Sequence, residues 1–156
     1  MNILLVEDLD SYFEAIRDGF ESRLNAPNIT RISTELEFRC QLPQLEKQAF
    51  DVAIFDVMIN WCTPEDTITP EGMNVPAEVL EEIDSKRSWR SGVRCRRMFQ
   101  EARKKADSRP VHCIHYSVLD IEDLRKEISD EEVELIGKSG DIEPLVRAIR
   151  RAVERV

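Results

Sequence analysis

Five polar residues of this chain each follow a short apolar run, and their types point to a definite kind of chemistry. They are Glu7, Asp8, Asp56, Ser117 and Lys138. Three carboxylates in one place repel one another and raise one another's pKa unless a cation is shared between them. Oxygen ligands with room for water suit Mg²⁺ or Mn²⁺. Gathered together, the five residues would supply a nucleophile, a metal site, a positive charge and a hydroxyl donor, which are the parts needed to hold a phosphoryl group on a carboxylate.

The elements that must gather these residues alternate along the chain. Apolar runs typical of buried parallel strands lie at 2–6, 51–55, 109–117 and 133–137, and a further candidate lies at 29–38. Apolar residues at helical spacing separate them, at 10–24, 42–50, 91–106, 121–128 and 141–156. Five strands alternating with five helices predict an α/β fold with a doubly wound parallel sheet, because each crossover is helical.

The boundary between the second strand and the second helix is ambiguous in the sequence. Ile32, Leu36 and Phe38 alternate with polar residues, which favours a strand from residue 29, although a helix that begins near Thr34 remains open. A short helix is expected over 42–50, with Pro43 in its first turn.

The predicted sheet brings the five polar residues to one edge. In open α/β sheets the ligand site lies beyond the carboxyl ends of the strands. The first, third, fourth and fifth strands end at this edge with, in order, Glu7 and Asp8, Asp56, Ser117 and Lys138. The sequence therefore predicts one site that contains all five.

Four stretches, "ILLVED", "DVAIFDVMI", "HYS" and "LIGKSGDIEPLVRAI", resemble the receiver domains of two-component response regulators, the CheY-like family. The resemblance covers residues 1–60 and about 91–156. It implies a flavodoxin-like, doubly wound five-stranded parallel sheet in the order 2-1-3-4-5. It also implies one receiver domain over residues 1–156, with an insertion at about 61–90.

The resemblance assigns a role to each residue of the predicted site. Asp56 would be the phosphoacceptor, and Lys138 would pair with the phosphoryl group. Ser117 would donate a hydrogen bond to a phosphoryl oxygen. The cofactor implied is Mg²⁺, and its ligands would be Glu7, Asp8, Asp56 and the backbone carbonyl of Met58.

Two other classes of phosphate-handling protein fit the sequence less well. A phosphatase of the haloacid dehalogenase class would place a second Asp two residues after its nucleophile, where this chain has Met58. A P-loop or dinucleotide-binding fold would have a glycine-rich turn after the first strand, where this chain reads "VEDLDS".

Three single residues depart from the receiver pattern. Leu135 stands where the family has a Tyr or Phe that reports phosphorylation, so signalling through such a ring is not expected. Val118 stands where the family has Ala or Gly, and its branched side chain is expected to narrow access to the acyl phosphate and slow its hydrolysis. Ser139 replaces the proline that follows the lysine in the family and so loosens the constraint on Lys138.

The fourth departure is the segment 61–90, which in the family is a short loop that ends near the glycine matched here by Gly92. A loop of this length inside a compact domain is uncommon unless it has a function. Helical spacing of apolar residues predicts a short helix within 75–89, and Trp61 and Trp89 are candidate anchors. The segment would act as a lid, a partner-docking element or a homodimer contact; a loop without a role is the alternative.

Charge and composition limit the classes of partner. The chain has 156 residues and a net charge of −9, which argues against direct nucleic-acid binding. Residues 86–109 nevertheless carry ten Lys and Arg against two acidic residues. This basic segment would face an acidic partner or a phosphate, or it would be a solvated helix face.

Cysteine spacing and hydropathy indicate the compartment. The residues Cys40, Cys62, Cys95 and Cys113 form no C-x-x-C pair, so buried reduced thiols are expected rather than disulfides or a zinc site. No apolar run approaches the roughly 20 residues of a membrane span, and the N-terminus has no signal-peptide pattern. We expect a cytoplasmic protein without membrane partners.

Two functions follow from these observations. The first is a stand-alone receiver that takes a phosphoryl group onto Asp56 from a histidine kinase or phosphotransfer protein, with Mg²⁺, and then switches the binding of a downstream protein. Such a protein is no conventional enzyme, but it would catalyse its own phosphorylation and dephosphorylation. The alternative is a receiver-like interaction module that works without phosphorylation. The five intact site residues favour the first function, whereas Leu135, Val118 and Ser139 favour the second.

Overall fold

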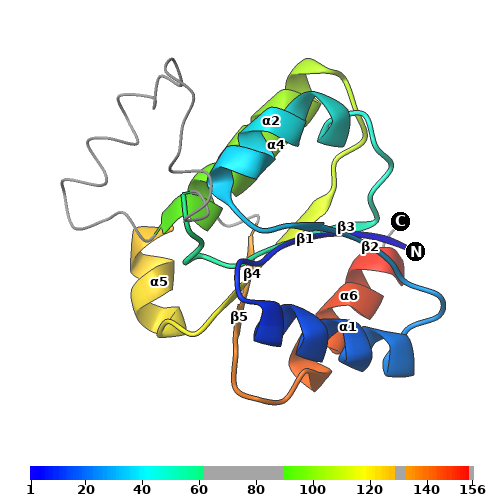
Figure 1. Ribbon diagram of the computed structural model, residues 1–156, viewed down its shortest axis with the longest axis vertical. Helices are drawn as coiled ribbons and strands as arrows, with labels where there is room; N and C mark the ends of the chain where they lie inside the picture. Colours follow the sequence, from blue (N-terminus) through cyan, green and yellow to red (C-terminus); the bar gives the residue numbers. More distant parts are fainter. Residues whose placement is uncertain (62–89, 129–132, 155–156) are drawn as a thin grey trace.

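A computed structural model describes residues 1–61, 90–128 and 133–154 of the chain. Its centre is a sheet of five parallel strands in the order β2-β1-β3-β4-β5 (Figure 1). The strands are β1 (Asn2–Val6), β2 (Asn28–Ile32), β3 (Val52–Phe55), β4 (His112–Ser117) and β5 (Glu134–Gly137). The predicted fold class and strand order are confirmed.

Helices cover both faces of the sheet and account for the apolar composition of the inner strands (Figure 1). They are α1 (Asp10–Arg23), α2 (Glu35–Leu45), α4 (Ser91–Lys105), α5 (Ile121–Glu127) and α6 (Glu143–Glu154). Helices α1 and α6 lie on one face, and α2 and α4 lie on the other, with α5 beside β5. A strand covered on both faces has no polar side, which is why β3 is buried at all four positions.

The hydrophobic core is divided by the sheet. Side chains such as Leu5 and Ile54 pack against α1 and α6, whereas their neighbours Leu4 and Phe55 pack against α2 and α4. Phe55 lies at the centre of the second cluster, with its ring 6.1 Å from the rings of Phe38 and Phe99. This packing fixes the end of β3, where Asp56 follows.

The second helix begins near Thr34, which is the alternative that the sequence left open, rather than at the expected 42–50. Strand β2 ends at Ile32, and α2 starts at Glu35, so Pro43 lies inside the last turns of this helix rather than in its first turn. The reason is a cap: Thr34 Oγ1 accepts a hydrogen bond from the backbone N–H of Glu37 at 3.1 Å. A Thr followed three residues later by Glu is a capping signal, and it prevails over the alternating pattern of apolar residues.

The surface differs in part from what the sequence suggested. Cys95 and Cys113 are buried as expected, but Cys40 is exposed, and Cys62 lies outside the described residues.

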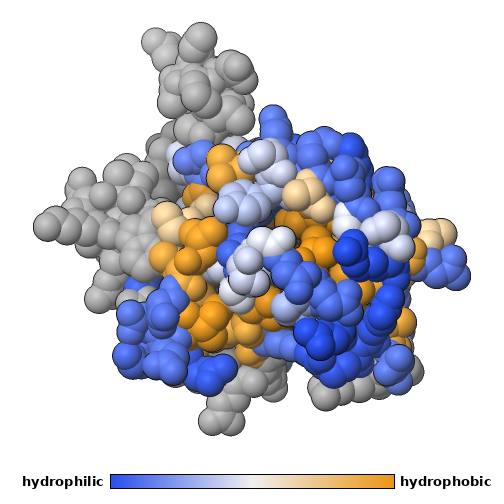
Figure 2. Space-filling view, turned by 90° about the horizontal axis from the view of Figure 1, so that it is seen from below, coloured by the Kyte–Doolittle hydropathy of each residue, from blue (hydrophilic) through white to orange (hydrophobic). Residues whose placement is uncertain are grey.

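Seen from the side of α1 and α6, hydrophobic residues gather in the middle of the molecule with hydrophilic residues around them (Figure 2). Among the described residues, no helix has the length and apolar character needed to cross a membrane.

Candidate functional site

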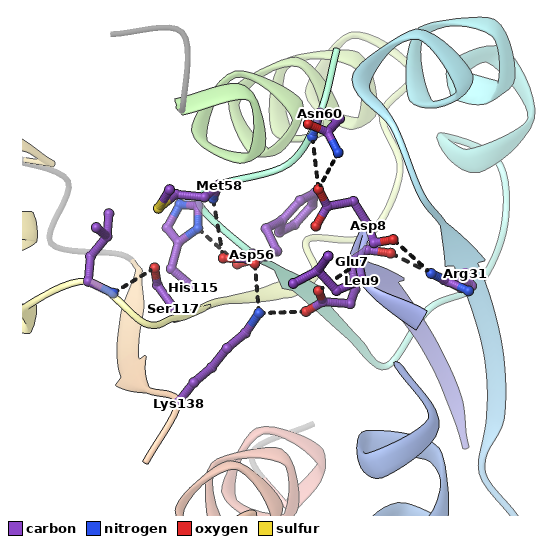
Figure 3. A network of polar contacts seen from close by, with 12 residues as sticks. Glu7, Asp8, Leu9, Arg31, Asp56, Met58, Asn60, His115, Ser117 and Lys138 are labelled. Carbon is purple, nitrogen blue, oxygen red and sulfur yellow. Dashed lines mark hydrogen bonds and ion pairs between the residues drawn. The ribbon is translucent and has the colours of Figure 1, made fainter. Parts of the chain in front are cut away.

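The carboxyl ends of β1, β3 and β5 meet in one group of charged side chains (Figure 3). The ammonium group of Lys138 lies 2.6 Å from Glu7 Oε2 and 2.6 Å from Asp56 Oδ2. All three side chains are at most 5% exposed. The backbone N–H of Lys138 also donates to the carbonyl of Ser117 at 2.7 Å, which links the ends of β4 and β5. Lys138 is thus bonded through both its side chain and its backbone, and the looser constraint expected from Ser139 stays a prediction.

Asp8 completes a cluster of three carboxylates. One oxygen each of Glu7, Asp8 and Asp56 lies within 4.8 Å of the others. Oδ2 of Asp8 accepts hydrogen bonds from the backbone N–H and the side-chain amide of Asn60, at 3.2 and 2.8 Å. Oδ1 of Asp8 is buried and accepts no hydrogen bond from any residue that the structure describes.

Backbone groups hold the acidic residues in place. The N–H of Leu9 donates to Glu7 Oε1, and the N–H of Met58 donates to Asp56 Oδ1, both at 3.2 Å. Each of these carboxylates thus turns one oxygen toward the backbone and the other toward Lys138. The metal-ligand role expected for the carbonyl of Met58 remains a prediction.

Arg31, at the carboxyl end of β2, supports the same loop from the other side. Its guanidinium donates to the backbone carbonyls of Glu7 and Asp8 at 3.1 and 3.2 Å (Figure 3). It also pairs with Asp10 at 2.7 Å and lies over the ring of Phe13. Two of its donors are bound to the carbonyl oxygens of Glu7 and Asp8 and a third to the carboxylate of Asp10, so Arg31 fixes the path of the acidic loop without pairing with the carboxylates of Glu7 and Asp8.

Ser117 lies at the end of β4, as predicted, and is fully buried. Its Oγ accepts a hydrogen bond from the N–H of Leu119 at 3.2 Å, which leaves the hydroxyl proton for donation elsewhere. Val118, the next residue, is 55% exposed.

A pocket of about 500 Å³ opens over the charged cluster. Asp8, Asp56 and Lys138 line it, together with Asn60, Trp61, Ser91 and Arg94. Four exposed apolar side chains complete its wall, and these are Leu9, Tyr12, Met58 and Val118. The pocket therefore has a charged part and an apolar part.

Burial dominates the electrostatics of the cluster. It raises the pKa of Glu7 and of Asp56 because the charged carboxylate is disfavoured away from water, and Lys138 opposes this rise only in part. For Lys138, burial acts to lower the pKa, but Asp56 and Glu7 outweigh it and raise the pKa. The lysine is therefore firmly protonated, and the two acids hold protons more readily than free carboxyl groups.

The residues fit a divalent cation on three grounds. Three carboxylate oxygens converge, and ionised carboxylates with a single ammonium leave a formal charge of −2. Oxygen donors of this kind are the ligands that Mg²⁺ prefers. The buried Oδ1 of Asp8 also needs a partner, since a polar atom without one is costly.

Gly92 brings α4 close to the site. A Cβ on this residue would lie 1.5 Å from the carbonyl oxygen of Asp56. Its N–H donates to the carbonyl of Val57 at 3.1 Å. Only a glycine permits this approach, so the sequence match of Gly92 has a physical reason.

A second ionic group ties the elements around the pocket together. Glu35, fully buried in the first turn of α2, binds the guanidinium of Arg94 from α4 at 2.6 to 3.1 Å. It also binds Arg39 at 2.8 Å. The backbone N–H groups of Glu35 and Leu36 donate to the carbonyls of Asn60 and Trp61, at 3.1 and 2.9 Å.

The basic segment 86–109 is not a continuous surface belt where the structure describes it. Arg96 is fully buried and donates to Gln100, and Arg103 is 6% exposed and donates to backbone carbonyls of residues 46, 48 and 109. Arg94 is paired with Glu35. Since Arg97 is exposed but Arg96 is not, only part of the segment remains a surface for partners. Residues 86–89 lie outside the described residues.

Sequence reasoning found the five charged and hydroxyl residues but missed three neighbours. Arg31 carried a weak signal, because it is a single cation at the end of a strand. Tyr12 lies 4.4 Å below the ammonium of Lys138, from ring centroid to Nζ, and has the spacing of an ordinary helix residue. Asn60 gave no signal at all, since its partner Asp8 is 52 residues away. Of the insertion expected at about 61–90, residues 62–89 lie outside the described residues, and so does the helix expected there.

No protein-family model and no curated protein matches this sequence. Solved structures do match its fold. The receiver domain of a Francisella response regulator is 15% identical, with a TM-score of 0.61, and the match covers 99% of this chain and 97% of that one. A response regulator receiver protein from Sinorhizobium medicae is 13% identical, with a TM-score of 0.62 and coverage of 99% and 94%.

A third neighbour has a metal in the corresponding fold. The receiver domain of a sensor histidine kinase from Pseudomonas aeruginosa is described with a magnesium ion coordinated in its active site cleft. It is 15% identical, with a TM-score of 0.58, and the match covers 98% of this chain and 97% of that one. The predicted resemblance thus holds at the level of structure, and the chain has the fold of response-regulator receiver domains.

Proposed function

We propose that this protein is a receiver that accepts a phosphoryl group on Asp56 and thereby switches the binding of a partner protein. The observation that carries the proposal is the position of Lys138, whose ammonium bridges Glu7 and Asp56 beside Asp8 in an open pocket. A buried lysine between two carboxylates is a costly arrangement for stability alone, because each charge loses its hydration. A role in holding a phosphoryl group accounts for it.

The chain's own residues suit the transfer step. A carboxylate oxygen of Asp56 attacks phosphorus in line with the leaving group, the new O–P bond forms as the donor's bond to phosphorus breaks, and the donor keeps that electron pair. Lys138 then moves from Asp56 Oδ2 to the phosphoryl oxygens, and its other partner, Glu7, keeps it in reach. The Ser117 hydroxyl donates to one of these oxygens. Stabilisation of the charge on the equatorial oxygens is the main contribution that a protein makes to such a reaction.

Mg²⁺ held by Glu7, Asp8, Asp56 and the carbonyl of Met58 would neutralise charge on the transferred group. The protein's contribution is to hold these metal-binding groups in fixed positions. Arg31 fixes the backbone of Glu7 and Asp8, and the N–H of Met58 orients Asp56.

The donor in this proposal is a histidine kinase or a phosphotransfer protein, which receiver domains commonly meet. The protein works in the cytoplasm as a single receiver domain over residues 1–156, with an insertion at about 61–90. It catalyses its own phosphorylation and dephosphorylation. Its downstream partner is a protein, bound through that insertion or the exposed part of the basic segment, and a homodimer contact through the insertion belongs to the same proposal.

The test is a mass measurement. The protein is incubated with Mg²⁺ and acetyl phosphate and then weighed intact. Phosphorylation adds about 80 Da to the wild type and nothing to Asp56→Asn, because the nucleophilic oxygen is lost. Asp51→Asn, at the other end of β3, is the matched control and retains the adduct. An equal adduct on Asp56→Asn, or none on the wild type, rules the proposal out.

A second function is favoured by one observation. Leu135 packs in an aliphatic cluster with Val57, Val93, Leu124 and Ile128, so the place of the family's signalling ring holds an aliphatic side chain. A receiver-like module that binds its partner without phosphorylation would have no use for a ring there. A partner whose affinity is the same for wild type and Asp56→Asn, with and without phosphodonor, would identify this second function.

A further inference from the structure

Asn60 is a residue that neither the sequence pattern nor the proposed transfer step uses, yet it contacts two functional parts of the molecule. It lies four residues after Asp56, in the segment that leaves β3. Its backbone N–H and its side-chain amide both donate to Asp8 Oδ2, at 3.2 and 2.8 Å (Figure 3). Its carbonyl accepts the backbone N–H of Glu35 at 3.1 Å.

The orientation of the Asn60 side chain follows from the charge of its neighbour. Turned over, the amide would face its oxygen toward a carboxylate oxygen of Asp8, which repels it. With the NH₂ group toward Asp8, two donors converge on a single oxygen. This fixes the rotation of the Asp8 carboxylate.

The fixed rotation has a consequence for the other oxygen of Asp8. Oδ1 is buried and receives no donor from the described part of the chain. The same carboxylate belongs to the cluster with Glu7 and Asp56. Because Oδ2 is occupied by Asn60, Oδ1 is the oxygen left for a ligand. Hydrogen bonds to a metal-binding carboxylate orient it, and their removal typically weakens metal binding about 10- to 100-fold.

We propose that Asn60 is a positioning residue that holds Asp8 with Oδ1 ready for a divalent cation, and that it links this site to the start of α2. The inference rests on the proposed function, since it assumes that the carboxylate cluster binds Mg²⁺. In this proposal Asn60 acts through Asp8, because its side-chain NH₂ group donates to Asp8 and its backbone carbonyl accepts from Glu35.

The link to α2 is made by backbone groups. The first N–H groups of a helix have no partner within the helix, and here the carbonyls of Asn60 and Trp61 accept those of Glu35 and Leu36. A change at Asp8 therefore reaches α2 through one residue, Asn60. Binding of Mg²⁺ should then shift the amide signals of Glu35 and Leu36.

The direct test is calorimetric titration of the metal-free full chain with Mg²⁺. Asn60→Ala removes the side-chain donor, and Asn60→Leu replaces it with an apolar side chain of similar size. We expect both variants to bind Mg²⁺ about tenfold more weakly, at the lower end of the usual range because the backbone N–H of residue 60 remains. The matched control is Asn28→Ala, since Asn28 is also exposed and donates its amide to an oxygen, but at the opposite edge of the sheet. Its affinity should equal that of the wild type.

Two further readouts separate positioning from a general structural role. With acetyl phosphate, the Mg²⁺ concentration for half-maximal phosphorylation should rise about tenfold in Asn60→Ala, whereas the rate at saturating Mg²⁺ should stay within about twofold. In NMR spectra, Mg²⁺ should shift the Glu35 and Leu36 amides of the wild type, and shift them less in Asn60→Ala.

The possible failures can be told apart. Equal Mg²⁺ affinity in the wild type and both Asn60 variants overturns the positioning role and leaves the proposed function standing. A wild type that binds no Mg²⁺ overturns both. A saturating rate that falls as strongly as the affinity shows general disruption of the site and also overturns the inference.

Discussion

At the scale of single residues, the electrostatics of the site follow from three charged groups that are already buried in the metal-free, unmodified protein. Glu7 and Asp56 share one ammonium, and burial disfavours their ionisation more than Lys138 favours it. The carboxylate of Asp56, the proposed acceptor, therefore has a raised proton affinity. A cation would release those protons, because metal binding requires the ionised carboxylate.

This balance predicts a pH dependence with a definite sign. The pKa values of Glu7 and Asp56 are raised above their ordinary values of 4.5 and 3.8, so the metal-free folded protein binds more protons than the unfolded chain in the range just above these values. Its stability relative to Asp56→Asn should fall as pH rises through that range, and Mg²⁺ affinity should rise. Urea unfolding of both proteins from pH 4 to 7, without and with Mg²⁺, measures this. Without Mg²⁺, a stability difference that grows with pH contradicts this prediction.

Val118 gives a prediction about the lifetime of the modified protein. Its exposed, branched side chain forms part of the pocket wall beside Asp56 and Lys138. We expect it to restrict water, so that the phosphorylated wild type persists well beyond seconds and Val118→Ala loses its phosphoryl group several-fold faster. Loss of the adduct is followed by mass after the donor is removed. Decay of the wild type within seconds, or equal decay of the two proteins, contradicts the steric argument.

At the scale of elements, the ends of α2 and α4 are fitted to the loop that carries Asp56. Glu35 binds Arg94 and Arg39 within the pocket wall, and Gly92 lets α4 approach the backbone of Asp56. These contacts join residues far apart in the sequence. They make the two helix starts part of the site.

Gly92→Ala should destabilise the protein. The added Cβ would lie 1.5 Å from the carbonyl oxygen of Asp56, so α4 or the loop must move. Overpacking of this kind costs about 1–3 kcal/mol, and more where the neighbour is backbone. Gly137→Ala is the control, because a Cβ added there would lie 3.7 Å from Ile121 Cγ1, which is an ordinary contact distance. Thermal and urea unfolding measure both; an equal effect would show that the close approach is relaxed in solution.

Glu35→Gln should also be strongly destabilising. It leaves two arginines beside a fully buried side chain that no longer carries charge, and breaking a buried ion pair costs about 3–5 kcal/mol. Glu101→Gln is the matched change in the exposed pair with Lys105 and should have little effect. The free energy of unfolding in urea decides the matter, and equal values for the two variants would show that the Glu35 pairs are not held in solution.

A feature of this molecule is predictable from the sequence when neighbouring residues determine it, and is not predictable when it depends on a partner far away in the sequence. Apolar runs and strand-end polar residues are local, so the parallel sheet and the group Glu7, Asp56 and Lys138 were predictable from the residues, whereas the strand order came from the resemblance to receiver domains. The start of α2 was left open between a strand and a helix beginning near Thr34, and a single cap decides for the helix. Asn60 and the inward pairing of Arg94 were not predictable, because each depends on a partner brought close only by folding.

At the scale of the whole molecule, a strongly charged chain keeps several of its charges inside. Arg96 and Arg103 come from the most basic part of the sequence, yet they are buried, whereas the acidic cluster opens to a pocket. Charge counted along the sequence therefore overstates the basic surface. A partner that bound the described part of this segment would meet exposed residues such as Arg97 rather than the buried Arg96.

The whole fold should respond to Mg²⁺. A ligand that binds only the folded state stabilises it by mass action, by about 2.7 kcal/mol at a free concentration roughly 100 times its Kd. We expect this gain for the wild type and a much smaller gain for Asp8→Ala, which lacks one carboxylate. Urea unfolding with increasing Mg²⁺, and with Na⁺ at matched ionic strength, measures it. Equal stabilisation of both proteins would indicate a general salt effect.

Glu35 has one more consequence, for protein engineering. Its N–H binds the chain as it leaves the sheet at Asn60, and its carboxylate binds the chain at Arg94, just after it returns. The chain on either side of the segment between Asn60 and Arg94 is thus bonded to the start of α2. This position therefore suits the exchange of segments between proteins, since a graft placed after Trp61 and before α4 would start and finish next to residues bonded to the start of α2, in the wall of the pocket that Asp56 lines.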